Sequence, residues 1–145
     1  MDRLKLQENQ RYALDTVVLI YFLERHPQFY QAARNIFSQI ESGQISAVCS
    51  TLVFAELLVP AFRAEKNEQA KKVVHILTNF PNLEIIPMTI DISITAARLR
   101  TTYGLRTPDA IHVATAMETK ATGIITNDKD LKKMASPDFG VWLFS

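Results

Sequence analysis

The chain has 145 residues, of which 48% are hydrophobic, and it carries a formal net charge of +1. That length and apolar content predict a single domain, residues 1–145, large enough to bury a core. A charge this close to zero gives no general attraction to nucleic acid, so binding of RNA or DNA must depend on local basic groups or on metal. The single cysteine, Cys49, excludes an intramolecular disulfide framework and a cysteine-rich zinc site.

The first half of the chain predicts two strands and three helices. Pro27 opens the second helix, Gly43 ends it, and Pro60 bends or shortens the third. In chain order these elements are a strand at 12–14, a helix at 17–24, a helix from Pro27 to Gly43, a strand at 45–49, and a helix that Ser50 or Thr51 caps and that ends at Phe62.

The second half predicts strands alternating with helices. They are a helix at 68–79, a strand at 83–87, a helix at 91–103 followed by Gly104, a helix at 109–120 capped by Thr107-Pro108, a strand at 123–126, a short helix at 129–134 and a strand at 141–144. This alternation predicts a three-layer α/β/α sandwich around a central, mainly parallel sheet. The ligand crevice of such a fold lies at the carboxyl ends of the strands.

The apolar segments are short. The longest runs, 17–23 and 52–55, fall well below the about 18 residues that a membrane span needs. The N-terminal segment 1–11 is polar and does not resemble a signal sequence. We therefore expect a soluble cytoplasmic protein that makes no contact with a membrane.

Four acids, Asp15, Glu56, Asp109 and Asp128, each interrupt or adjoin an apolar or small-residue stretch. Burying an unpaired carboxylate costs at least several kcal/mol, and a shared Mg²⁺ or Mn²⁺ ion relieves both that cost and the mutual repulsion. Asp15 and Asp128 follow predicted strands and so leave the sheet at its carboxyl edge, and Asp109 lies in a first helical turn. Glu56 lies in a helix that is apolar almost all round, and we expect that helix to be buried.

Each acid also has a structural interpretation. Asp15 and Asp128 can cap the helices that follow them, and Asp109 can be an ordinary first-turn acid. Glu56 can pair with Arg63, two turns further along. His112, three residues after Asp109, is a possible ligand. We interpret it as a core residue that packs beside Ala116 and hydrogen-bonds the backbone, because imidazole is not the preferred partner of Mg²⁺.

Four segments that contain these acids resemble the motifs of a known family. They are residues 14–21 (LDTVVLIY), 51–57 (TLVFAEL), 105–116 (LRTPDAIHVATA) and 125–131 (ITNDKDL). In order and spacing they resemble PIN-domain nucleases, and the chain length is similar to that of the prokaryotic VapC-like toxins. The resemblance runs from about residue 12 to the C-terminus, and the third segment is the most specific. One departure is Val17, where the family often has a small polar residue that can support the metal site.

The resemblance implies a Mg²⁺- or Mn²⁺-dependent endoribonuclease. It further implies the toxin of a toxin–antitoxin pair, which is held inactive by a cognate antitoxin protein and is commonly a homodimer. The RNA products of such a nuclease carry a 5′-phosphate and a 3′-hydroxyl. Asp15, Glu56, Asp109 and Asp128 are thereby assigned as the catalytic, metal-binding cluster. Thr16 and Thr126 are assigned as supporting polar groups.

Carboxylates of this kind hold one or two cations that activate water for in-line attack on phosphorus. Arg106 and Lys129 adjoin the acids and are our candidates for binding the RNA strand. Asp128 and Asp130 lie two residues apart, so only one can be a primary ligand. We expect Asp128 to hold that role and Asp130 to support it by favouring the dipole of helix 129–134.

Four apolar residues of the helix ending at Phe62 exceed what one helix stripe can hide: Phe54, Leu57, Leu58 and Phe62. They indicate a dimer or antitoxin surface, or a larger monomer core. Two other functions compete with this one. A haloacid-dehalogenase-like phosphatase needs a second acid two residues after the first, where this chain has Val17. A noncatalytic RNA-binding or assembly module on a PIN fold is the stronger alternative, because fold does not determine function.

Overall fold

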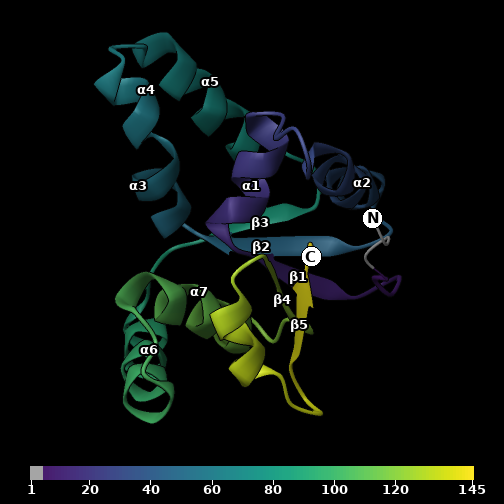
Figure 1. Ribbon diagram of the computed structural model, residues 1–145, viewed down its shortest axis with the longest axis vertical. Coiled ribbons are helices and arrows are strands. Elements are labelled where there is room, and N and C mark those ends of the chain that lie inside the picture. The colour runs from purple at the N-terminus through teal and green to yellow at the C-terminus, as the bar shows by residue number, and fades with distance from the viewer. Residues whose placement is uncertain (1–4) are drawn as a thin grey trace.

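The computed structural model describes residues 5–145 as a five-stranded sheet with helices on both faces (Figure 1). Residues 1–4 lie outside the described residues. They belong to the polar segment 1–11, which we did not expect to be a signal sequence. The strands, in the order β3-β2-β1-β4-β5, are β3 (Leu83–Ile86), β2 (Ser46–Ser50), β1 (Arg11–Leu14), β4 (Gly123–Thr126) and β5 (Gly140–Leu143). All four pairings between these strands are parallel, which confirms the predicted three-layer α/β/α sandwich.

Each face of the sheet packs against its own helices. The helices α1 (Thr16–Leu23) and α2 (Tyr30–Ser42) form one core with the sheet. The helices α6 (Ile90–Tyr103) and α7 (Thr107–Glu118), with the 3₁₀ helix η1 (Lys129–Met134), form the other. The strands read as apolar runs because both of their faces are covered. In β1, Tyr12 and Leu14 enter the first core and Ala13 enters the second.

The helices α2 and α7 each begin two or more residues away from the predicted start. The helix α2 begins at Tyr30 rather than Pro27, because the His26 ring accepts hydrogen bonds from the backbone N–H groups of Gln28 and Phe29, each at 3.1 Å. Those bonds stabilise a turn in place of a first helical turn. In α7 the N-cap position belongs to Arg106, so Thr107-Pro108 forms the first turn instead of capping it.

The predicted helix from Thr51 to Phe62 divides at Leu58 into α3 (Leu52–Leu57) and α4 (Val59–Arg63), two residues before Pro60. The expectation that it is buried is wrong. Within α3 the structure buries Val53, whereas the Glu56 side chain is 37% exposed. The reason is placement: α3 and α4 extend beyond the end of the sheet (Figure 1), whereas α5 (Asn67–Thr78) reaches the core through Leu77.

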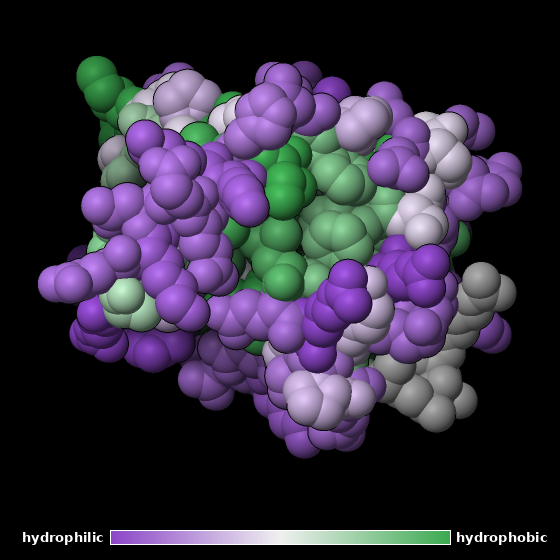
Figure 2. Space-filling model, turned by 90° about the horizontal axis from the view of Figure 1, so that it is seen from above, coloured by the Kyte–Doolittle hydropathy of each residue, from purple (hydrophilic) through white to green (hydrophobic). Residues whose placement is uncertain are grey.

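Apolar side chains gather in a hollow on the side of the molecule seen from above (Figure 2). Two pockets lie among the helices α1, α3, α4 and α5: one between α1 and the α4–α5 pair, and one along α4 and α5. Phe62 is 55% exposed and Val59 is 38% exposed. No helix among residues 5–145 combines the length and the apolar character needed to cross a bilayer.

Candidate active site

A pocket of about 470 Å³ lies where β1 and β4 end, at the point where the order of the strands reverses. Ligand sites of open parallel sheets form at such reversal points. All four predicted acids line this pocket. Its lining residues are Asp15, Thr16, Val17, Ile20, Tyr21, Glu56, Arg106, Asp109, Asn127 and Asp128.

Asp15 is buried in the site and is held there by two hydrogen bonds. It is the N-cap of α1, where the Thr16 backbone N–H donates to Oδ1 at 2.7 Å, and the Thr126 hydroxyl donates to Oδ2 at 2.6 Å. Burial raises the pKa of Asp15 above its ordinary value, although His112 and the two hydrogen bonds act in the opposite direction. The predicted capping role and the predicted place in the site therefore belong to the same carboxylate.

Asp128 also combines both predicted roles. Its Oδ1 accepts the backbone N–H of Asp130 at 3.0 Å and so caps η1, while its own N–H donates to Thr126 Oγ1 at 3.0 Å. Thr126 thus joins Asp15 and Asp128, which follow the ends of the neighbouring strands β1 and β4. Asp130 is exposed in the first turn of η1 and does not belong to the pocket lining, and neither does Lys129.

Glu56 is bound by two groups through one oxygen. The Thr16 hydroxyl donates to Oε1 at 2.7 Å, and His112 Nε2 lies 2.8 Å from the same atom. The hydrogen bond to His112 lowers the pKa of Glu56, against the opposing effect of partial burial. An ionised Glu56 can only accept, so this contact assigns the proton to His112 Nε2. Within the described residues Glu56 makes no ion pair with Arg63, so that alternative is not observed.

His112 is buried, as predicted, but its expected hydrogen bond to the backbone is not observed in the described residues. Its side chain is only 2% exposed, but Nε2 bonds Glu56, and the buried Nδ1 has no hydrogen-bond partner in the described part of the chain. The sequence feature that places His112 near the site is its spacing, because a residue three after Asp109 shares that face of the helix.

Two further residues that line the pocket, Tyr21 and Asn127, were not predicted from the sequence as site residues. Asn127 Nδ2 donates a 3.0 Å hydrogen bond to the Tyr21 hydroxyl.

Asp109 pairs with Arg106, three residues before it. Arg106 Nε lies 3.1 Å from Asp109 Oδ2, and Arg106 Nη2 lies 4.0 Å from Asp128 Oδ2. Asp109 raises the pKa of Arg106 through the hydrogen bond and through its charge. The Asp109 side chain is 13% exposed and that of Arg106 is 78% exposed, so the ion pair lies at the mouth of the pocket.

The donor set fits a hard divalent cation. Its members are carboxylates, which Mg²⁺ and Mn²⁺ prefer, and burial leaves Asp15 with an incompletely balanced charge. Across residues 5–145, however, no three acidic, histidine or cysteine side chains are already arranged as a cage for an ion. Arg106 and His112 are the basic side chains that contact these carboxylates in the structure. Val17 lines the pocket with an apolar side chain, as its departure from the motif predicts.

The parallel α/β/α sandwich and its carboxylate-lined pocket define an α/β protein with an acidic site at the switch point of the sheet. The model of the PIN domain family matches residues 12–137. The chain belongs to the PIN domain family.

Solved structures with the same fold include toxin–antitoxin proteins. VapBC2 from Rickettsia felis, bound to a promoter DNA fragment, aligns with a TM-score of 0.70 and 22% identity over 91% of this chain and 98% of that one. A toxin–antitoxin complex from Klebsiella pneumoniae aligns at 0.65 and 23%, over 89% and 95%. VapC20 from Mycobacterium tuberculosis, a sarcin–ricin loop cleaving toxin, aligns at 0.69 and 14%, over 88% and 97%. No curated protein sequence matches the chain significantly.

Proposed function

We propose that the protein is a metal-dependent endoribonuclease and the toxin of a toxin–antitoxin pair. The observation that carries this proposal is the convergence of Asp15, Glu56, Asp109 and Asp128 on one pocket of a PIN fold. The fold that the chain shares with VapC20, a toxin that cleaves the sarcin–ricin loop, supports a nuclease. A nuclease of this kind acts on RNA in the cytoplasm, where we place it.

Asp15, Glu56 and Asp109 are the residues that would hold Mg²⁺ or Mn²⁺, with Asp128 beside them. When bound, the cation lowers the pKa of a coordinated water and neutralises charge on the phosphate oxygens. The chain itself orients the carboxylates. Thr126 and the Thr16 backbone hold Asp15, and the Thr16 hydroxyl and His112 both bind Oε1 of Glu56. Ligands held in this way need little reorganisation before the reaction.

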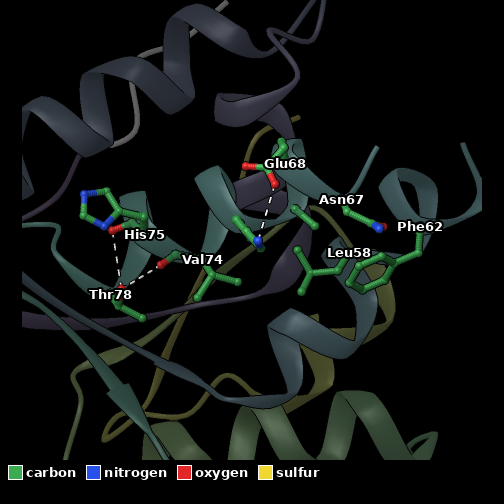
Figure 3. Close-up of a pocket in the computed structure, with 9 residues that line it drawn as sticks. Leu58, Phe62, Asn67, Glu68, Val74, His75 and Thr78 are labelled. Atoms are coloured by element: carbon green, nitrogen blue, oxygen red, sulfur yellow. Dashed lines mark hydrogen bonds and ion pairs between the residues drawn. The ribbon is translucent and has the colours of Figure 1, made fainter. Parts of the chain in front are cut away.

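The exposed apolar surface of α4 and α5 fits the partners of a toxin. A second pocket, of about 670 Å³, lies along these helices, and Leu58, Phe62, Val74 and Glu68 are among the residues that line it (Figure 3). We assign this surface to protein contacts, with the cognate antitoxin and with a second copy of the chain. The neighbours from Rickettsia felis and Klebsiella pneumoniae are themselves toxin–antitoxin assemblies.

The decisive experiment is RNA cleavage by the purified protein freed of any partner. With Mg²⁺ or Mn²⁺ it should cut a single-stranded RNA, and chelation should stop the reaction. Asp15→Ala and Glu56→Ala should each lose at least about two orders of magnitude in rate, because loss of a ligand disturbs both charge and alignment.

Cleavage that survives excess chelator would contradict the proposed mechanism. A noncatalytic PIN-fold module would instead bind metal and RNA without cutting, so the same assay separates the two functions. Asp138→Ala is a suitable control, because Asp138 is exposed in a distant turn and does not line the pocket.

A further inference from the structure

Arg106 is the one arginine or lysine among the ten residues that line the acidic pocket. Its guanidinium contacts Asp109 through Nε at 3.1 Å and approaches Asp128 through Nη2 at 4.0 Å. Its charge also lowers the pKa of Glu56, although less than the hydrogen bond from His112 does. One side chain thus acts on acids from three separate parts of the chain.

The backbone and the side chain of Arg106 differ in freedom. The residue is the N-cap of α7, with extended φ and ψ of −67° and 153°, and Pro108 restricts the first turn of the same helix. The side chain is 78% exposed, so its charge stays hydrated whether or not it contacts Asp109. Exposed ion pairs of this kind are weak, and little free energy is needed to break them.

A divalent cation and the guanidinium need the same oxygens. Asp109 Oδ2 accepts the Nε–H of Arg106, and Asp128 Oδ2 faces its Nη2. A cation bound by Asp109 repels the guanidinium and attracts the carboxylate more strongly, because it carries twice the charge. The arginine is then displaced at the mouth of the pocket. Its planar set of donors matches the oxygens of a phosphate, which is the group that an RNA strand brings to this place.

We propose that Arg106 exchanges partners: it pairs with Asp109 and Asp128 until a divalent cation binds these acids, and then it binds a phosphate of the RNA. Arg106 thereby couples metal loading to substrate binding, because the guanidinium is free for RNA only when the acids are occupied. This inference rests on the proposed function, and it adds to it a competition between Arg106 and the metal.

The first measurement is Mn²⁺ affinity without RNA, read from the electron paramagnetic resonance signal of free Mn²⁺. Arg106→Gln removes the competing charge and should bind Mn²⁺ about two- to fivefold more tightly than the unmodified protein, the range expected for an exposed ion pair. Arg100→Gln makes the same chemical change at an exposed position of α6 outside the pocket, and it should leave the affinity unchanged.

The second measurement is cleavage kinetics at saturating Mn²⁺. Arg106→Gln should raise KM for a single-stranded RNA by about tenfold, the effect of losing one charge-assisted contact to a phosphate. Arg106→Lys keeps the charge without the planar fork and should give an intermediate KM. A substitution that tightens metal binding and weakens substrate binding is the signature of exchange, because a merely structural role moves both in one direction.

Two results would overturn the exchange. One is a Mn²⁺ affinity of Arg106→Gln equal to or weaker than that of the unmodified protein, and the other is tighter Mn²⁺ binding with an unchanged KM. If neither the unmodified protein nor Arg106→Gln binds Mn²⁺, the proposed function is overturned, and the exchange with it. Melting of both proteins in chelator verifies that they fold equally well.

Discussion

At the scale of single residues, Asp15 and Glu56 differ in how the protein treats their charge. Burial raises the pKa of Asp15, whereas the hydrogen bond from His112 lowers the pKa of Glu56. Glu56 is therefore ionised readily, and Asp15 holds a charge that the surrounding protein compensates only in part. A bound cation would compensate the remaining charge of Asp15.

The raised pKa of Asp15 predicts a pH-dependent effect of Asp15→Asn in chelator. A folded-state pKa above the ordinary 3.8 means that the native protein binds the proton more tightly than the unfolded chain does. The free energy of unfolding therefore falls as the pH rises from the unfolded-state pKa through the folded-state pKa. Asp15→Asn lacks this loss. Its melting temperature relative to the unmodified protein should rise by a few degrees between pH 4 and pH 7. A difference that shrinks over this range would show that Asp15 is well compensated.

His112 predicts an effect on metal affinity with little effect on folding. His112→Leu removes the hydrogen bond to Glu56 and should weaken Mn²⁺ binding by about tenfold, as loss of a bond that orients a metal ligand typically does. His112→Gln can still donate to Glu56 and should retain most of the affinity. Mn²⁺ titration with parallel melting curves tests this. Equal affinity in all three proteins would assign His112 to packing alone.

Asp128 and Asp130 predict opposite results for the same substitution. Asp128→Asn keeps an oxygen that can accept the Asp130 N–H, so the cap of η1 survives while the charge at the pocket is lost. It should lower metal-dependent cleavage with little change in stability. Asp130→Asn should keep cleavage and lose roughly 0.3 kcal/mol through the helix dipole. Cleavage lost in Asp130→Asn but kept in Asp128→Asn would reverse the assignment.

At the scale of elements, the ends of β1 and β4 carry the site, so the contact of β4 with its other neighbour matters. Gly123 pairs with Gly140 on β5, and a Cβ at Gly123 would overlap the Gly140 carbonyl and the ring of Trp142. Trp142 in turn packs edge-on against Tyr12 of β1, with ring centroids 4.9 Å apart. The two glycines thus leave room for the aromatic pair that covers β1 and β4.

Gly123→Ala should destabilise the protein by about 1 to 3 kcal/mol, because the backbone of β5 has no room to yield. Trp142 is the only tryptophan of the chain, so its emission reports the disturbance directly. Gly104→Ala is the control: Gly104 has φ of 67° and open space around it, so the cost there is backbone strain alone. Trp142 emission should shift in Gly123→Ala and stay unchanged in Gly104→Ala.

At the scale of the whole molecule, a net charge of +1 conceals an uneven distribution. Four acids from distant parts of the chain face one pocket, and Arg106 and His112 are the basic groups beside them. Folding therefore works against local repulsion, which a bound cation relieves. The native state should accordingly be more stable with metal than without it.

Mn²⁺ at about 100 times its dissociation constant should stabilise the native state by roughly 2.7 kcal/mol, or several degrees in melting temperature. Asp109→Asn should abolish most of this shift, since it removes a ligand. Asp138→Asn makes the same change outside the pocket and should keep the shift. A melting temperature of the unmodified protein that is indifferent to Mn²⁺ would assign the four acids to structure and not to metal.

Local features of the sequence determined the elements and their order. Apolar runs marked the strands, and glycines that adopt the left-handed conformation at Gly43 and Gly104 ended two helices where predicted. The alternation of strands and helices predicted the parallel sheet. The geometry of such sheets then placed Asp15 and Asp128, which come just after strands, at its carboxyl edge. These features depend on neighbouring residues, which is why the sequence alone was enough.

Contacts between distant residues required the tertiary structure. Thr126 bonds Asp15 from 111 residues away, and His112 bonds Glu56 from 56 residues away. Periodicity placed His112 on the same helix face as Asp109, but it did not say which group that face meets. It also assigned the α3 segment to the core, although the segment extends beyond the sheet and leaves Glu56 partly exposed. The sequence by itself determined which carboxylates converge, and the packing of separate elements decided which partners hold them.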